Sequence, residues 1–193
     1  MRNLLLAVLI LVLTNSQAQQ QVIPYHGYTS YYNTKTLIPD SVIWIITKAH
    51  LAGHKTPRSN QFHATSGRPN LKRDYGGSGY DQGHNSPYDD NYWGDQVEYE
   101  CFDYVNMFPQ RHILNAQTWE HLEDYSRRLA LQYGAVKVKI SWVGVDKKIG
   151  PDSVVVPLYC IKELWYNEAH EKYIMPNRDT VIRHPFAFYS IKR

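Results

Sequence analysis

The feature that most restricts the fold is one amphipathic segment, NAQTWEHLEDYSRRLALQYG at residues 115–134, set among stretches of β-branched and aromatic residues. Its apolar side chains recur at the three- and four-residue spacing of a helix. They are Trp119, Leu122, Leu129 and Tyr133. Asn115 suits the N-cap, and Gly134 suits the position that closes a helix. We therefore expect one substantial helix between these two residues.

Five segments rich in β-branched and aromatic residues surround this helix and predict strands: residues 41–51, 97–108, 136–145, 153–167 and 186–191. In the second, Phe102, Tyr104 and Asn106 alternate onto one face, and Pro109 ends the strand. The fourth is interrupted or bulged at Pro157. Strands around one good helix predict a single α+β domain with a mainly antiparallel sheet.

The amino-terminal residues have the pattern of an export signal. A short basic start precedes an unbroken apolar run, LLLAVLILVL, and Ser16 and Ala18 then provide small residues at the spacing that a signal peptidase accepts. We expect a signal peptide at residues 1–18, a mature domain at residues 19–193 with no membrane anchor, and a secreted or periplasmic protein. The sequence leaves monomer and homodimer open.

Composition indicates a packed globular domain, since 43% of the residues are hydrophobic and the chain holds 16 tyrosines and 5 tryptophans. The formal net charge of +3 is too small to indicate a nucleic-acid partner. Cys101 and Cys160 both fall in strand-like segments, and they are either a disulfide or two buried thiols. Their spacing is not that of a zinc site.

Residues 52–95 are dominated by glycine, proline, asparagine and other polar residues. A stretch of this length without periodicity in a compact domain is usually functional or disordered. Its aromatic residues argue against disorder, and they are Phe62, Tyr75, Tyr80, Tyr88, Tyr92 and Trp93. We expect a loop region that is held in place by packing.

Polar residues around this region suggest a phosphate site. His84 lies near the end of the loop region, Asn106 and Gln110 lie at the exit of the next expected strand, and Asn115 opens the helix. A helix N-terminus attracts phosphate, and an asparagine oxygen beside it suits Mg²⁺, which keeps several waters. A neutral imidazole within reach can take a proton from an attacking water. Together these groups favour metal-assisted phosphodiester hydrolysis.

Each residue also has a purely structural explanation. Most loop histidines are surface or turn residues, and an asparagine at a helix start is usually only a cap. Glu123 and Arg127 stand four residues apart, in the favourable orientation for a solvated ion pair along a helix. From the residues alone, metal-assisted hydrolysis is a hypothesis based on their combination.

Two sequence stretches resemble the DNA/RNA non-specific endonucleases, a family of sugar-non-specific ββα-metal (His-Me finger) nucleases that includes endonuclease G. They are DQGHNSP at residues 81–87 and NMFPQRHILNAQTWEHLEDYSR at residues 106–127. The family signature is Asp-Arg-Gly-His, then Asn-x-x-Pro-Gln, then an Asn, a Trp and a Leu-Glu. Fainter likeness surrounds this core, at RSNQF and DYGGSGYD before it and at VVVPLYCIKELWY and YIMPN after it.

The resemblance implies a role for each matching position. His84 matches the general base, Asn115 the direct ligand of Mg²⁺ (Mn²⁺ or another divalent ion being alternatives), and Glu123 a carboxylate that holds metal-bound waters. The other matches are Asp81 as a second group near the metal, Arg58 as a cation on the pentavalent phosphate, and Asn106, Gln110 and Arg127 as residues of the substrate site. The implied substrates are DNA and RNA, held through phosphate and sugar.

One position departs from the signature, because Gln82 stands where the family has arginine. Glutamine keeps hydrogen-bond donors but loses the charge and the two-pronged geometry of a guanidinium. At a phosphate this loss costs about 1.5–3 kcal/mol. We expect Gln82 to contact substrate in a variant nuclease. The alternatives are a catalytically weakened homologue that acts as a nucleic-acid-binding module, and a secreted structural or adhesion domain.

Basic residues that precede the motif offer a second substrate contact. A basic wall is one interpretation, and scattered solvated surface charges are the other. The residues are Lys48, His50, His54, Lys55, Arg58, Arg68, Lys72 and Arg73.

Overall fold

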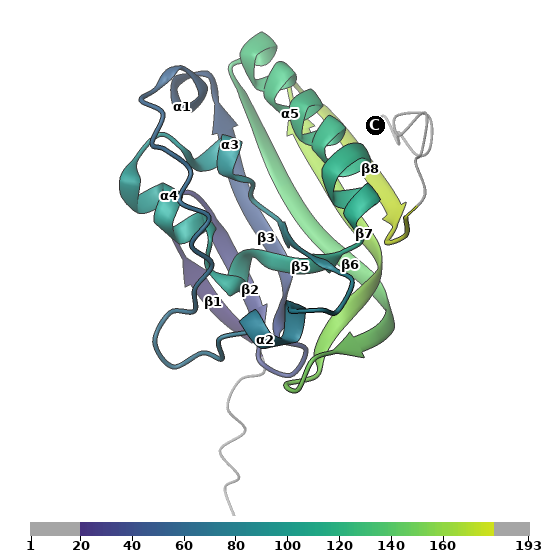
Figure 1. Ribbon diagram of the computed structural model, residues 1–193. Coiled ribbons are helices and arrows are strands. Elements are labelled where there is room, and N and C mark those ends of the chain that lie inside the picture. Colours follow the sequence, from purple (N-terminus) through teal and green to yellow (C-terminus); the bar gives the residue numbers. More distant parts are fainter. Residues whose placement is uncertain (1–19, 180–193) are drawn as a thin grey trace, which may run out of the picture.

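A six-stranded antiparallel sheet organises the fold (Figure 1). This computed structural model describes residues 20–179. The strands pair in the order β1-β2-β3-β6-β7-β8, and every neighbouring pair is antiparallel. Their bounds are β1 Gln20–Pro24, β2 Thr29–Asn33, β3 Ile38–Thr47, β6 Ala135–Ile149, β7 Val154–Tyr166 and β8 Ala169–Pro176. The expected α+β class with a mainly antiparallel sheet is confirmed.

The connection between β3 and β6 supplies the described helices and a two-stranded ribbon, β4–β5. In Figure 1 these elements lie over one face of the large sheet. Their bounds are α1 Lys48–Ala52, α2 Lys72–Tyr75, β4 Asp81–His84, α3 Tyr88–Asn91, α4 Asp95–Cys101, a 3₁₀ turn Tyr104–Asn106, β5 Met107–Gln110, a π-helical stretch Leu114–Trp119 and α5 Glu120–Tyr133. Among residues 20–179 no helix is long and apolar enough to cross a membrane.

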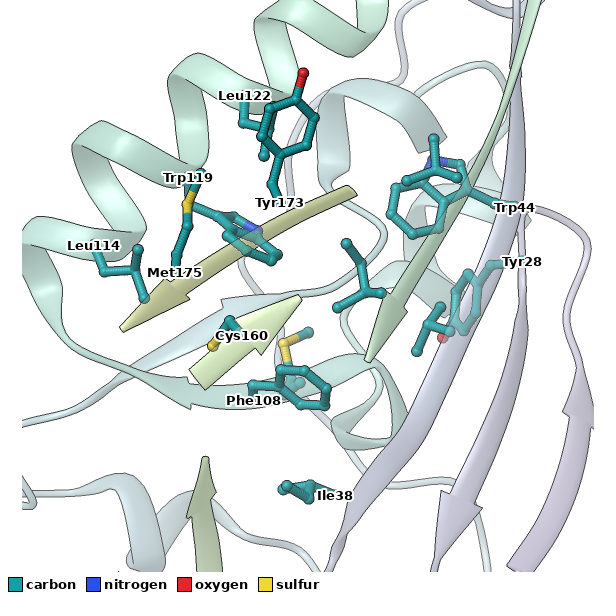
Figure 2. Close-up of a cluster of buried hydrophobic side chains, with 14 of the residues drawn as sticks. Tyr28, Ile38, Trp44, Phe108, Leu114, Trp119, Leu122, Cys160, Tyr173 and Met175 are labelled. Atoms are coloured by element: carbon teal, nitrogen blue, oxygen red, sulfur yellow. The ribbon is translucent and has the colours of Figure 1, made fainter. Parts of the chain in front are cut away.

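The hydrophobic core fills the space between the covered face of the sheet and the helical segment. Figure 2 shows Leu114, Trp119 and Leu122 packed against Tyr173 and Met175 of β8. These five side chains are at most 3% exposed. Burying an aliphatic or aromatic side chain of this size stabilises the fold by about 1.5–3 kcal/mol. This packing therefore holds the helical segment, and the site residues that it carries, against β8.

Strand β6 shows how the sequence alternation decides which face is buried. Val136, Val138 and Ile140 are at most 1% exposed and point into the core. Lys137 and Lys139 alternate with them and lie on the opposite face. The predicted strand with one polar face is confirmed, and it extends beyond residue 145 to Ile149.

The helix prediction is confirmed at its end and wrong at its start. Gly134 closes α5 with a φ of 92° and donates its N–H to the carbonyl of Ala130 at 2.8 Å. Asn115, however, already donates its backbone N–H to the carbonyl of Arg111 at 2.9 Å. It therefore lies inside the helical path and is not an N-cap. The π-helical winding around Asn115 is of a kind that is frequent at functional sites.

Residues 97–108 are not the strand that their apolar alternation predicts. Helix α4 and the 3₁₀ turn occupy most of this segment, and only Met107–Gln110 are extended. Asp103 explains the turn, because its carboxylate accepts from the backbone N–H of Val105 at 3.1 Å and from the hydroxyl of Tyr25 at 2.6 Å. Hydrogen bonds to residues distant in sequence thus override a short local pattern.

The other strand predictions have mixed outcomes. Strand β3 ends at Thr47, whose hydroxyl caps α1, so residues 48–51 are helical. The irregularity expected at Pro157 is present as a register shift in β6 between Val145 and Lys147, opposite this proline. The predicted strand at 186–191 and the predicted signal peptide lie outside the described residues.

Both cysteines are free thiols in the buried interior, so the structure favours the thiol interpretation over the disulfide. Burial raises the pKa of the Cys160 thiol to about 12. Its sulfur accepts a weak contact from the side-chain amide of Gln110 at 3.9 Å. Neither thiol is poised to be a nucleophile at neutral pH.

Candidate active site

The β4–β5 ribbon places His84 at the end of its first strand. His84 pairs in register with Met107, and Gly83 pairs with Phe108. Gly83 sits directly over the side chain of Gln110, where a Cβ atom would lie 1.9 Å from Oε1. The glycine before the histidine is therefore required by space, because any larger residue collides with the neighbouring strand's side chain.

The imidazole of His84 lies in an aromatic surrounding. Its ring centroid is 5.0 Å from that of Phe102 in an edge-on arrangement and 5.4 Å from that of Phe62. The Nε2 atom is buried and has no hydrogen-bond partner. Burial first, and the charge of Arg58 second, lower the pKa of His84 to about 3. The imidazole is therefore neutral at physiological pH and able to accept a proton.

Asn106 fixes the turn that follows His84. Its side-chain amide donates to the carbonyls of Ser86 at 2.8 Å and Cys101 at 2.9 Å, and its oxygen accepts from the N–H of Ser86 at 2.9 Å. The side chain is fully buried. Asn106 therefore ties Ser86 to Cys101 through its buried side chain, and it does not line the cleft.

Asn115 meets Asp81 across the first turn of the helical segment. The Asn115 amide nitrogen donates to Asp81 Oδ2 at 3.0 Å, and His112 Nδ1 lies 2.9 Å from the same oxygen. Because the amide nitrogen is engaged with Asp81, the amide oxygen of Asn115 is left as an acceptor or ligand.

This set of donors fits one kind of metal site. Among residues 20–179, no three or more His, Cys, Asp or Glu side chains are grouped as a site for a metal ion. A cage of carboxylates or a zinc site is therefore absent from this part of the chain. One amide oxygen beside one carboxylate, in an open cleft, suits Mg²⁺, which retains most of its waters.

Glu123 presents a carboxylate from about two turns further along the helical segment than Asn115. Its side chain is 12% exposed, and Oε1 lies 3.9 Å from Nζ of the buried Lys162. Burial raises the pKa of Glu123 to about 7, and burial lowers the pKa of Lys162 to about 8. The charge of each group partly offsets the pKa shift that burial causes in the other.

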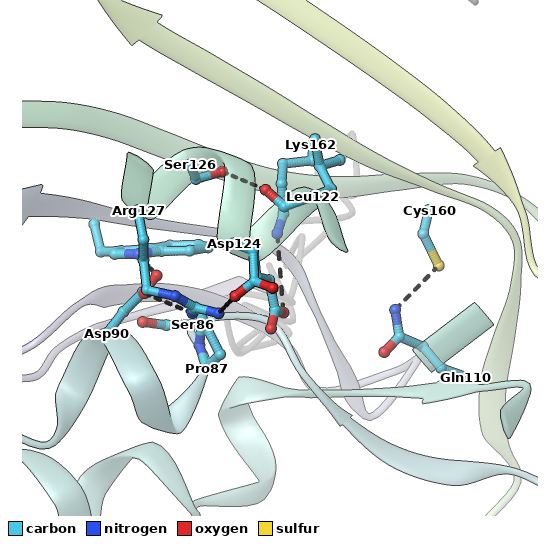
Figure 3. A network of polar contacts seen from close by, with 12 residues as sticks. Ser86, Pro87, Asp90, Gln110, Leu122, Asp124, Ser126, Arg127, Cys160 and Lys162 are labelled. Carbon is cyan, nitrogen blue, oxygen red and sulfur yellow. Dashed lines mark hydrogen bonds and ion pairs between the residues drawn. The ribbon is translucent and has the colours of Figure 1, made fainter. Parts of the chain in front are cut away.

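Arg127 forms its ion pairs with Asp90 and Asp124 and not with Glu123. Figure 3 shows its guanidinium between Asp90, at 3.1 Å, and Asp124, at 2.6 Å. Asp90 also accepts from the indole N–H of Trp44 at 2.9 Å. The purely structural alternative, a solvated ion pair between Arg127 and Glu123, is therefore not what the ion pairs of the described residues show. Arg127 instead joins α5 to α3 through a partly buried ion pair.

Arg58 extends from the loop region over two aromatic rings. Its guanidinium carbon lies 5.3 Å from the ring centre of Tyr88 and 5.5 Å from that of Phe102. Its Nε donates to Asn60 at 2.7 Å. These contacts hold a cation beside His84, in a position suited to a phosphate.

A cleft of about 710 Å³ brings most of the predicted site residues together. Six of them line it: Arg58, Asp81, Gln82, His84, Asn115 and Glu123. Asn106, Gln110 and Arg127 are outside the lining, and the first two are fully buried. The expected direct substrate contact of these three is not supported by their positions, because other protein groups surround their polar atoms.

The lining also contains Asp89 and Glu120, which sequence reasoning missed, and the loop aromatics Phe62 and Tyr88, which it singled out without assigning them to the site. Glu120 was detectable, since it stands three residues before Glu123 on the same helix face. Of the proposed basic wall, Arg58 and Lys72 line the cleft. Lys55 lies over the ring of Tyr92, at 5.0 Å.

Gln82, the departure from the family signature, is tied to the wall of the cleft. Its amide nitrogen donates to the hydroxyl of Tyr104 at 3.0 Å. Tyr104 is itself 2% exposed and stacks on Tyr75 with ring centres 6.0 Å apart. Gln82 therefore contributes a fixed, uncharged polar group where a guanidinium is expected.

Comparison with known proteins agrees with this geometry. The curated relatives include "Nuclease 1, mitochondrial" of Schizosaccharomyces pombe, which is 28% identical over 86% of this chain and 60% of its own length. The "Mitochondrial nuclease" of Saccharomyces cerevisiae is 32% identical over 70% of this chain and 47% of its own length. The chain thus spans about half the length of these relatives.

A solved structure shares the fold. A chain in the crystal structure of the EndoG/EndoGI complex superposes with a TM-score of 0.79 at 25% identity, covering 88% of this chain and 79% of that chain. Bovine "Endonuclease G, mitochondrial" is 28% identical over 78% of this chain and 58% of its own length.

The same comparison contradicts the expected secreted or periplasmic location. The relatives from both yeasts and from cattle are mitochondrial nucleases, so the comparison gives no support to export.

The sequence model of the DNA/RNA non-specific endonuclease family matches residues 9–192 of this chain. The match includes every residue of the cleft described above. The chain therefore belongs to the DNA/RNA non-specific endonuclease family.

Proposed function

We propose that this chain is a metal-dependent endonuclease that hydrolyses phosphodiester bonds of DNA and RNA. The observation that supports it most directly is the shared cleft, in which a neutral His84, the amide of Asn115 and the carboxylate of Glu123 meet. Family membership and the nuclease relatives support the same reaction.

His84 is proposed as the general base. Its Nε2 atom is enclosed by protein, so Nδ1 is the ring nitrogen that can take a proton from a water in the cleft. The rings of Phe62 and Phe102 restrict the imidazole's rotation. A pKa near 3 keeps the lone pair available at neutral pH, although it also means that the proton is released readily.

Asn115 and Glu123 would hold a divalent cation, Asn115 through its amide oxygen and Glu123 through bound waters. When bound, Mg²⁺ would supply positive charge against the phosphate oxygens. Asp81 orients Asn115 by accepting from its amide nitrogen. Arg58, exposed beside His84, would pair with the charge that builds on the phosphate.

Substrate contact through phosphate and sugar implies little sequence preference. Arg58 and Lys72 are cations of the cleft wall, and Gln82 provides a neutral polar group in the same wall. A homologue weakened by Gln82, which binds nucleic acid without cutting it, is the main alternative.

A digestion assay separates the two. Plasmid DNA and RNA are incubated with the purified chain in Mg²⁺, in Mn²⁺ and in EDTA, beside His84→Ala. We expect cleavage by wild type that requires a divalent ion and that is lost in the variant. Equal inertness of wild type and His84→Ala refutes the nuclease proposal, and retained binding to nucleic acid would then favour the binding module.

Asn115→Ala tests the metal site. We expect loss of cleavage with an unchanged thermal unfolding midpoint, because the side chain faces the cleft and donates only to Asp81. Weaker binding of Mn²⁺, measured by electron paramagnetic resonance without substrate, is the independent readout. Full activity in Asn115→Ala would remove this residue from the role.

A further inference from the structure

Lys162 is a fully buried lysine in the middle of β7, directly behind the cleft. In register it pairs with Ile140 of β6 and Tyr173 of β8, both of which are core residues. An isolated ammonium group at such a position costs several kcal/mol unless it is paired. A buried lysine among apolar neighbours therefore calls for a specific partner.

Its partners are two residues of the helical segment, four positions apart. The ammonium nitrogen lies 4.6 Å from the ring centre of Trp119 and 3.9 Å from Oε1 of Glu123. Residues four apart lie on one face of a helix, so Lys162 contacts a single stripe of it. Trp119 provides a π-face for the cation, and Glu123 provides the opposite charge.

Of the acidic side chains around Lys162, Glu123 is the one that forms an ion pair with it. The other buried acid nearby, Asp90, already accepts from the guanidinium of Arg127 at 3.1 Å and from Trp44 at 2.9 Å. Figure 3 shows Arg127 directed at Asp90 and Asp124, and neither of these two carboxylates is paired with Lys162. Arg127 thus pairs with Asp90 and Asp124, and Lys162 pairs with Glu123.

Glu123 connects this buried cation to the cleft. Its carboxylate contacts Lys162 on one side, and its side chain lines the cleft on the other. Lys162 is in turn fixed by the strand pairing of β7 and by the ring of Trp119, so its ammonium group gives the Glu123 side chain a fixed point of contact. Without that cation the Glu123 side chain would lose this contact and could turn away from its place beside the cleft.

We propose that Lys162 is a positioning residue, which holds the carboxyl group of Glu123 at the edge of the cleft. This inference rests on the proposed function, because it assigns Lys162 a part in the same reaction. Lys162 does not touch the substrate. Its effect on catalysis passes through Glu123.

The test replaces Lys162 by methionine, which has nearly the same volume and no charge, and by glutamine as a second neutral variant. We expect kcat per folded molecule to fall by about 10- to 100-fold, the range typical of residues that orient metal-site ligands, with little change in KM. Folded protein is quantified by near-ultraviolet circular dichroism.

The matched control is Glu171→Gln, which also removes a buried charge beneath α5. Glu171 is 4% exposed and accepts from the hydroxyls of Tyr125 and Tyr166, at 3.3 and 2.6 Å, but does not line the cleft. We expect this variant to lose stability while its folded fraction keeps the wild-type kcat. A general effect of buried-charge loss would instead reduce kcat in both.

A double-mutant cycle with Glu123→Gln shows whether Lys162 acts through Glu123. We expect Lys162→Met to lower kcat in the wild-type background and to have no further effect beside Glu123→Gln. Equal losses in both backgrounds, an unchanged kcat, or failure of both neutral variants to fold would overturn the proposal. If wild type itself is as inert as His84→Ala, the proposed function has failed instead.

Discussion

Gly83→Ala is the substitution whose consequence follows most directly from the structure. The added Cβ would lie 1.9, 2.5 and 2.7 Å from Oε1, Cδ and Cγ of Gln110. Gln110 is fully buried on β5, so its side chain cannot move into solvent. The collision must therefore be relieved by displacing β4, which carries His84, or by repacking the core around Gln110.

Overpacking of this kind costs about 1–3 kcal/mol. For a domain of this size each kcal/mol lowers the unfolding midpoint by about 2–4 °C, so we expect a drop of roughly 2–12 °C. Cleavage should fall more than stability does, because His84 is the next residue on the displaced strand. Urea unfolding and digestion of plasmid DNA measure the two effects separately.

The same substitution made in a Gln110→Ala variant tests the clash directly, because that variant lacks the three Gln110 atoms with which the new Cβ would collide. In that background Gly83→Ala should cost less than about 1 kcal/mol, which gives a favourable coupling between the two changes. If the costs of the single substitutions simply add, the clash does not exist and the spatial explanation of Gly83 is refuted.

Three further predictions follow from the site. Asn106→Ala should cost about 2–4 kcal/mol in urea unfolding, because it removes three buried hydrogen bonds and leaves their partners unpaired, and a cost below 1 kcal/mol would contradict this. Below pH 6.5 His84 becomes protonated in the unfolded chain, whereas in the folded chain its pKa of about 3 keeps it neutral. The free energy of unfolding should therefore fall toward pH 3 by up to about 1.4 kcal/mol per pH unit. His84→Gln should flatten this slope, and equal slopes in wild type and variant would contradict the prediction. Gln82→Arg should lower KM for nucleic acid and increase by about one the dependence of log affinity on log salt concentration, and an unchanged salt dependence would place residue 82 away from the phosphates.

Much of the fold could be predicted where hydrophobic periodicity agrees with tertiary packing. The alternation of residues 136–145 and the helical spacing that ends at Gly134 both correspond to elements in the structure. Residues 97–108 could not be assigned this way. Their turns are stabilised by residues distant in sequence, such as Tyr25 on Asp103 and His26 on Glu100, and no local pattern records those contacts.

The sequence brings most of the candidate site residues into one place, because all of them except Arg58 lie in two short motifs with fixed spacing. Six of the nine predicted side chains line one cleft. The motif could not distinguish a residue that reaches the cleft from one that supports it. Asn106, Gln110 and Arg127 belong to the second kind, and only their burial and hydrogen bonds show it.

Lys162 marks the limit of reasoning from local sequence. It stands in CIKELWY, where a charged residue between apolar ones ordinarily points to solvent. The register shows otherwise, because Lys162 pairs with the buried Ile140 and so faces the core. An inward lysine becomes intelligible only when Glu123, on a helix that crosses the same face, supplies its counter-charge. The cleft therefore depends on pairs such as Lys162 with Glu123 and Gly83 with Gln110, which are distant in sequence and meet only when the sheet and helix pack.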